Sequence, residues 1–139
     1  MSFALAVAEV QGQLINKVGL KEYGDPRVES LVTAKGGDFD GVYLLRFATV
    51  GEPWIEAEVS PTHWFAECQL EICTLLKNDE VTDAAAMATR ARQAQQYLLH
   101  TSLTSGTVFD SRQARIIRNG NDRRLVWRWQ FKLRYTEAP

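Results

Sequence analysis

Few side chains of this sequence are of the types that carry out covalent chemistry. The 139 residues include two histidines, His63 and His100, and two cysteines, Cys68 and Cys73. Nucleophilic catalysis needs a nucleophile, a base and an orienting group, and the sequence has no Gly-x-Ser-x-Gly turn that would hold such a nucleophile. His63 begins an expected strand on its polar side, and His100 lies near the end of an expected helix, where it favours the helix dipole. We therefore expect a protein that is not an enzyme.

The spacing of the acids and thiols argues against a metal or a carboxylate pair. Cys68 and Cys73 lie five residues apart in an expected strand, so they point to opposite faces and neither bridge nor share a metal easily. We interpret them as two buried, inert thiols. Glu67 and Glu71 share a strand face, but the strand rise separates them by about 13 Å, which is too far for a direct acid/base pair. No cofactor is expected.

Charge is the most informative property of the sequence. Residues 1–89 carry six basic and fourteen acidic side chains, whereas residues 90–139 carry ten basic and three acidic ones. This asymmetry indicates charged partners or association between complementary surfaces. The segment 112–134 alone holds eight basic residues and one acid, Asp122.

Two interpretations of this basic segment stay open. A nucleic-acid-binding protein would place these charges on phosphates, but the aromatics interleaved in residues 125–135 lie on the opposite strand face and are typical of a core. Alternatively, the basic face pairs with acids, either Glu67 and Glu71 across the same sheet or the acids of a neighbouring copy. Because interfaces favour arginine, we predict an interface at exposed positions. These candidates are Arg112, Arg115, Arg118, Arg123, Arg124, Arg128, Glu67 and Glu71.

Length and hydropathy predict one domain over residues 1–139, large enough to bury a core of its own. No apolar run approaches the roughly 18 residues that span a bilayer, and the N-terminus lacks a basic signal-peptide region, so we expect a cytosolic protein without a membrane partner.

Hydrophobic periodicity predicts the helices. A helix capped by Ser2 and ending near Gly19 carries an apolar stripe at helical spacing. A short second helix is expected after Pro26, ending at residues 36–37. A third, Ala-rich helix begins with Thr82 as its N-cap and ends near Leu99. The stripe of the first helix is Phe3, Val7, Val10, Leu14 and Val18, and that of the third is Met87, Ala91, Ala94 and Leu98.

Alternation and turn residues predict the strands. We expect strands at 42–50, 54–59, 63–75, 112–118 and from 125 to the C-terminus, with Asn119-Gly120 forming a hairpin turn. Trp54 is interpreted as core at the start of its strand, with an interface anchor as the alternative. Residues 103–111 are expected to be a loop that can order against another subunit. Together these elements predict an α+β fold, with a mostly antiparallel sheet of about five strands and two or three helices packed on one face.

The order helix, strands, helix, closing hairpin resembles the tail terminator proteins of long-tailed bacteriophages, the family related to minor tail protein U. The stretch from His63 to Ile72, with an aromatic start followed by alternating acids and apolar residues, is similar to the central strand of that family. Leu125 to Tyr135 resembles its closing strand.

The resemblance implies a structural, non-enzymatic protein. Tail terminators form a ring, usually a hexamer, that caps the tail tube, stops its polymerisation and offers a surface for joining the head. Implied partners are further copies of this chain, the major tail tube protein and a head-completion or neck protein. The implied location is the virion tail, after assembly in the host cytoplasm. A closed ring needs two complementary patches on each copy, and the charge asymmetry could supply them. Nucleic acid would then only pass through the ring.

Overall fold

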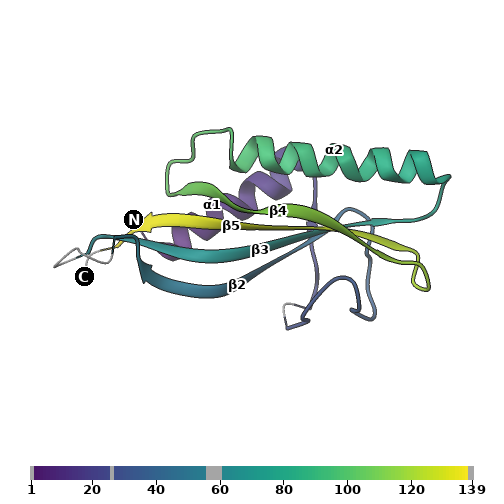
Figure 1. Ribbon diagram of the computed structural model, residues 1–139, viewed down its shortest axis with the longest axis horizontal. Coiled ribbons are helices and arrows are strands. Elements are labelled where there is room, and N and C mark those ends of the chain that lie inside the picture. The colour runs from purple at the N-terminus through teal and green to yellow at the C-terminus, as the bar shows by residue number, and fades with distance from the viewer. Residues whose placement is uncertain (1, 26, 56–60, 138–139) are drawn as a thin grey trace.

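The computed structural model describes residues 2–25, 27–55 and 61–137 of the chain. In these residues, both α-helices lie on one face of a five-stranded sheet (Figure 1). The sheet order is β1-β2-β3-β5-β4, and only the β1 and β2 pair is parallel. The predicted α+β class with a mostly antiparallel sheet is confirmed. The strands are β1 (Lys21–Glu22), β2 (Val42–Pro53), β3 (His63–Leu75), β4 (Thr107–Asn119) and β5 (Arg124–Thr136).

The first helix forms where its apolar stripe predicts it. The α-helix α1 (Phe3–Gln13) continues into a π-helical turn, η1 (Leu14–Val18). The Ser2 side chain accepts a hydrogen bond from the backbone amide of Leu5, and Gly19 ends the helix with a φ of 81°. Glycine adopts this left-handed conformation without the steric cost that a Cβ atom imposes.

The second α-helix, α2 (Glu80–Leu98), begins earlier than predicted. Its N-cap is Asp79, whose carboxylate accepts bonds from the backbone amide and the hydroxyl of Thr82. Thr82 is therefore a residue of the first turn and not the cap. Aspartate is at least as good an N-cap as threonine, so the helix begins at the earlier of the two residues. No helix in the described part of the chain is long and apolar enough to cross a membrane.

The main core lies between the helices and the sheet. The predicted stripes of both helices face it, with Val10, Leu14, Met87 and Leu98 almost fully buried. They pack against the alternating apolar residues of β3 and β5, of which Trp129 is fully buried. The sheet residues of this core include Tyr43, Ala66, Cys68, Leu70, Ile72, Leu125, Trp127, Trp129, Phe131, Leu133 and Tyr135.

Three of the strand predictions are wrong in detail. The turn expected at residues 51–53 is instead the end of β2, which bulges there with Gly51 at a φ of 80°. Trp54 and Ile55 form a bend and not a strand, and residues 56–59 of that expected strand lie outside the described residues. β4 begins at Thr107, within the expected loop, because Thr107 and Val108 pair with β5.

The segment between α1 and β2 is the main surprise of the fold. The helix expected after Pro26 is wrong: residues 27–33 form bends and turns. The segment passes from the helix side of the sheet to the opposite side (Figure 1). There its apolar residues form a second, smaller core, and the Tyr23 hydroxyl donates to the carbonyls of Lys35 and Gly36. This second core comprises Tyr23, Leu31, Ala34, Phe39, Val42, Leu44, Cys73 and Val126.

The two ends of the chain and the loop after α2 are also held by polar contacts. The amide of Phe3 donates to the Glu137 carboxylate at 2.8 Å. Glu9 of α1 accepts from the amides of Thr104 and Ser105 and from the Thr104 hydroxyl. Burial raises the pKa of Glu9, but these three donors outweigh it and lower the pKa below its usual value. The loop is thereby fixed to the helix layer.

Candidate interaction surface on the sheet

The sheet face that is turned away from the helices has two differently built halves. In the half that we call the covered half, residues 23–25 and 27–39 lie over the sheet residues of the second core and over Glu71, Arg124 and Arg128. The half that we call the open half carries no such layer among the described residues. Pairing registers place the following residues on it: Phe65, Glu67, Gln69, Phe109, Arg112, Arg115, Gln130, Lys132 and Arg134.

Glu71 is the centre of the covered half. Its side chain is 1% exposed and accepts from the amide of Leu31 at 2.8 Å and from the Ser30 hydroxyl at 2.9 Å. Arg128, its partner across β3 and β5, donates from Nε to the same carboxylate at 2.8 Å, and its Nη2 lies 2.7 Å from that carboxylate in an ion pair. The charge of Glu71 is therefore fully paired within the chain, as a buried charge must be.

Arg124 is held in the same half. It is 5% exposed, and one guanidinium nitrogen donates to the carbonyls of Leu31 at 3.0 Å and Ala34 at 2.6 Å. The guanidinium also lies 3.5 Å from the centre of the Phe39 ring, a cation–π contact. The arginine satisfies backbone carbonyls of the covering segment, which that irregular segment cannot pair by itself.

Three of the eight predicted interface residues are thus misplaced. Glu71, Arg124 and Arg128 were expected on the surface, but the covering segment buries Glu71 and Arg124 and partly buries Arg128, and all three serve the fold. The apolar spacing of this segment favoured a helix, and no local pattern indicated that the segment would lie over the sheet. The pairing of Glu71 with a basic residue across the sheet is confirmed.

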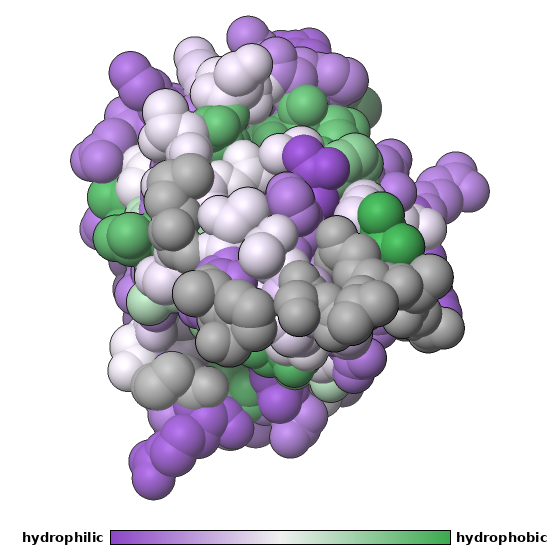
Figure 2. Space-filling view, turned by 90° about the vertical axis from the view of Figure 1, so that its left-hand side faces the viewer, coloured by the Kyte–Doolittle hydropathy of each residue, from purple (hydrophilic) through white to green (hydrophobic). Residues whose placement is uncertain are grey.

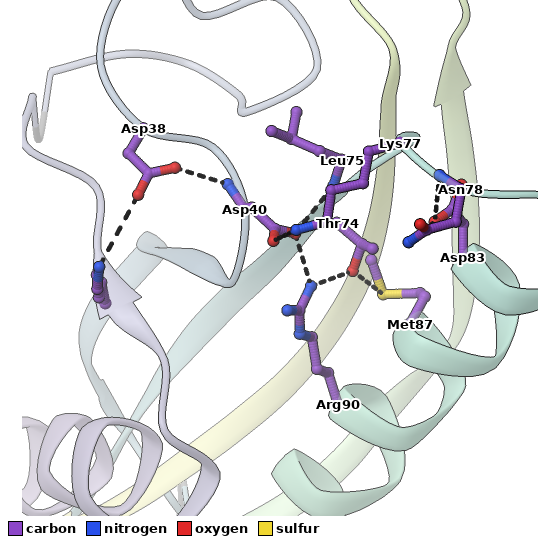
Figure 3. Close-up of polar contacts among 10 residues, drawn as sticks. Asp38, Asp40, Thr74, Leu75, Lys77, Asn78, Asp83, Met87 and Arg90 are labelled. Carbon is purple, nitrogen blue, oxygen red and sulfur yellow. Dashed lines mark hydrogen bonds and ion pairs between the residues drawn. The ribbon is translucent and has the colours of Figure 1, made fainter.

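Part of the charge asymmetry is also used inside the chain. Arg118 forms an ion pair with Glu80 at the start of α2. Arg90 of α2 donates to Asp40 at 3.2 Å, and Lys77 donates to the same carboxylate at 2.6 Å (Figure 3). Acids of the first 89 residues therefore neutralise bases of the last 50 within one molecule. Only the remaining charges are free for contacts with a partner.

Asp40 shows how tightly this end of the sheet is held. Besides the two cations, it accepts from the amide of Leu75 at 3.2 Å (Figure 3). Burial raises its pKa, but the bonds from Lys77, Leu75 and Arg90 outweigh burial and lower the pKa below 3.8. Arg90 also donates to the Thr74 hydroxyl at 2.7 Å, which joins α2 to β3.

An aromatic cluster marks the open half. Trp54 and Phe109 have ring centres 4.9 Å apart, and Phe65 lies edge-on to Trp54 at 5.8 Å. All three are partly exposed. Lys132 lies over the Phe65 ring at 4.8 Å, and Arg134 lies 5.4 Å from the Phe109 centre. The interpretation of Trp54 as a core residue is therefore wrong. Trp54 belongs to a cluster on the surface.

Two hollows lie beside this cluster. One, of about 240 Å³, is lined by Arg112, Gln113, Arg115, Arg128 and Gln130. The other, of about 290 Å³, shares Arg112 and Gln130 and adds Glu67, Gln69 and Lys132. Arg112, Arg115 and Arg123 are exposed, and no carboxylate among the described residues lies within ion-pair distance of them. Glu67 is partly exposed and lies opposite Lys132.

The residues of this cluster were missed from sequence, although a signal existed. Phe65 and Phe109 pair with Arg134 and Lys132 of β5, so both lie on the basic face. The aromatics of β5 itself do face the core, as predicted. The alternation of β3 placed Phe65 on the polar side of that strand, together with Glu67 and Gln69, and this placement is confirmed. Phe109 could not be placed in this way, because it lay in an expected loop.

Apolar exposure elsewhere is scattered. Figure 2 views the end of the molecule at which the chain begins and ends, where hydrophobic residues form small separate patches among hydrophilic ones. Val50 and Ile55, at 50% and 53% exposed, lie at and just after the end of β2, close in sequence to Trp54. Both residues are neighbours of the aromatic cluster in sequence.

The described residues offer little for covalent chemistry. Cys68 and Cys73 lie in the two different cores, and burial raises the pKa of each thiol to about 12, so neither is a ready nucleophile. Among the described residues, the one hydrogen bond of the His63 side chain joins its Nδ1 atom to the hydroxyl of Thr62 at 3.2 Å. No group of three or more potential metal ligands occurs among these residues.

Binding is therefore the chemistry that the surface supports best. Aromatic and arginine side chains that are partly exposed on a rigid sheet are typical of protein interfaces. No protein-family model matches this chain, and a search of curated proteins finds no relative.

Proposed function

We propose that this protein is a structural assembly protein of a phage tail, a terminator or tail-completion ring that caps the tail tube. The observation that carries the proposal is the open half of the sheet, where aromatic and basic side chains lie uncovered by the rest of the described chain. The order of elements and the patterns of β3 and β5, which resemble the tail terminator family, supply the specific role.

The remaining charges favour an asymmetric contact. Arg112, Arg115 and Lys132 make one side of the open half basic, while Glu67 and Glu52 are acids on or near the same sheet face. A ring closes through two different patches on each copy, so complementary patches suit it better than a twofold contact. Contacts of this kind weaken as salt screens them.

The test is the mass in solution by light scattering, over a range of protein and salt concentrations. We expect a closed oligomer that dissociates as the salt concentration rises. We also expect the purified protein to stop the growth of tail tubes. Phe109→Ser combined with Arg134→Ser should abolish both properties. Arg92→Ser, which changes an exposed residue of α2, is the matched control and should abolish neither. A protein that stays monomeric at high concentration and leaves tube growth unchanged would refute the proposal.

A second candidate function is the binding of single-stranded nucleic acid. One observation favours it: Phe65, Phe109 and Trp54 share a face with Lys132 and Arg134, and aromatics beside basic residues form platforms on which bases stack. Affinity for an oligonucleotide should then fall steeply with salt. Arg112→Gln with Lys132→Gln should reduce the slope of log affinity against log salt by about 1.4. An affinity that is independent of salt would remove this candidate.

A further inference from the structure

β4 forms an exposed edge of the sheet. β5 pairs with one of its sides, and no strand among the described residues pairs with the other. Eight of its thirteen residues are exposed, including Ile116 at 56%. An edge of this kind presents backbone N–H and C=O groups that another chain can pair with. The registers of Arg115 to Asn119 run without interruption, so this part of the edge is straight.

The edge is basic where its backbone is irregular. The register shifts between Asp110 and Arg112 and again between Arg112 and Arg115. Both arginines line the hollow of about 240 Å³, together with Arg128 and two glutamines. The one acid of β4, Asp110, lies on the opposite face of the strand, where it accepts a bond from the Trp129 ring nitrogen at 2.8 Å. Guanidinium groups in such a setting bind carboxylates by paired hydrogen bonds.

The charges select the occupant. A second copy pairing through its own β4 would bring arginines against arginines, and like charges opposite each other destabilise a sheet. A phosphate backbone cannot continue the hydrogen-bond ladder of an edge strand, and Glu67 in the adjoining hollow repels it. An extended protein segment with carboxylates can continue the hydrogen-bond ladder of the edge strand, and its charge is opposite to that of the arginines.

We propose that the outer edge of β4 binds an extended acidic segment of another protein as an added strand, whose carboxylates contact Arg112 and Arg115. Side chains two residues apart point to the same face of a strand, so alternate acids would reach the arginines while the backbone pairs along β4. This inference rests on the proposed assembly role and deepens it, because it states the chemistry of the partner.

The experiment measures binding of a labelled ten-residue peptide of alternating glutamate and threonine, by fluorescence anisotropy. We expect saturable binding that weakens with salt. Arg112→Glu with Arg115→Glu should weaken it at least ten-fold, and Arg92→Glu on α2 should change it less than two-fold. A peptide with the same acids but a central proline should bind at least ten-fold more weakly, because proline interrupts the ladder. Circular dichroism confirms that each variant is folded.

Three results would overturn the inference. They are equal binding of the proline peptide, equal binding to the doubly reversed variant, and tighter binding of a single-stranded oligonucleotide of the same charge, which would favour a nucleic-acid partner. Loss of peptide binding with oligomerisation and tube capping intact refutes this inference alone. Peptide binding by a protein that neither oligomerises nor caps tubes refutes the proposed function and leaves the peptide site standing.

Discussion

The covered and open halves of the sheet start from the same pattern and end with different roles. In both, charged residues of β3 and β5 alternate with apolar residues that enter the main core. Glu71 and Arg128 are neighbours across the two strands, and so are Glu67 and Lys132, four residues away. The first pair is buried in a network of hydrogen bonds, whereas the second lies beside a hollow.

The comparison shows that a charged strand face does not by itself identify an interface. Residues 23–25 and 27–39 convert one half of the face into a second core, whereas no described segment covers the other half in this way. Where the segment lies, charged side chains serve as hydrogen-bond partners for its backbone and are costly to remove. Where it is absent, the same residue types are available to a partner.

The largest expected effect is at Glu71. Glu71→Ala removes the buried acceptor of the Leu31 amide, the Ser30 hydroxyl and the partly buried Arg128 guanidinium, and should reduce the free energy of unfolding by about 3 to 5 kcal/mol. Glu67→Ala, the matched change in the open half, should alter it by about 0.5 kcal/mol or less. Denaturant unfolding measures both. Equal losses would mean that the two halves do not differ as described.

Neighbouring arginines of the hairpin provide the next comparison. Arg124→Gln removes the charged donor to the carbonyls of Leu31 and Ala34 and should cost about 2 kcal/mol. Arg123→Ala changes an exposed residue of the turn and should cost about 0.5 kcal/mol or less. Thermal unfolding distinguishes them. If Arg124→Gln has no effect, the arginine does not hold the covering segment.

Low pH should reduce the stability that Asp40 contributes at the end of the covered half. The folded pKa of Asp40 is lowered, so its contribution to stability is present above the unfolded pKa of 3.8 and is lost as pH falls through the folded pKa. We expect Asp40→Asn to cost about 1 kcal/mol at pH 7. The difference from the wild type should shrink below about pH 4. A constant difference from pH 7 to pH 3 would contradict this.

The smallest effect on stability is expected in the open half. Arg112→Gln with Lys132→Gln should change the free energy of unfolding by about 0.5 kcal/mol or less. The same variant should nevertheless weaken the contact with the partner, measured as oligomer mass or peptide binding. A large loss of stability would show that these side chains serve the fold, as those of the covered half do.

Much of the fold could be predicted because it follows local patterns. The alternation in β3 and β5 placed both strands, the Asn119-Gly120 turn joined β4 to β5, and the stripes of α1 and α2 placed the helices. Errors arose where local signals compete. Gly51 and Pro53 are typical of a turn, but pairing with β3 extends β2 through them. Residues 27–33 have an apolar spacing that suits a helix, but the sheet surface beneath them imposes turns.

The candidate site was less predictable. Arg112 and Arg115 were identified correctly as exposed residues, and so was Arg123. Trp54, Phe65 and Phe109 were not grouped, because they come from three parts of the chain that only the sheet brings together. Phe109 lies more than 40 residues from the other two, and proximity between segments so far apart leaves no trace in the spacing of either segment.

The sequence by itself determined which faces of the helices and of β3 and β5 are apolar, since side chains repeat every two residues in a strand and about every 3.6 in a helix. It also determined the basic character of the last hairpin. Only the tertiary structure decided which charges are buried, because the crossing of residues 27–39 to the second face depends on contacts distant in the chain. That crossing buries Arg124, partly buries Arg128 beside Glu71 and leaves Arg112 and Arg115 on the surface, so burial and not residue type sets the role of each arginine.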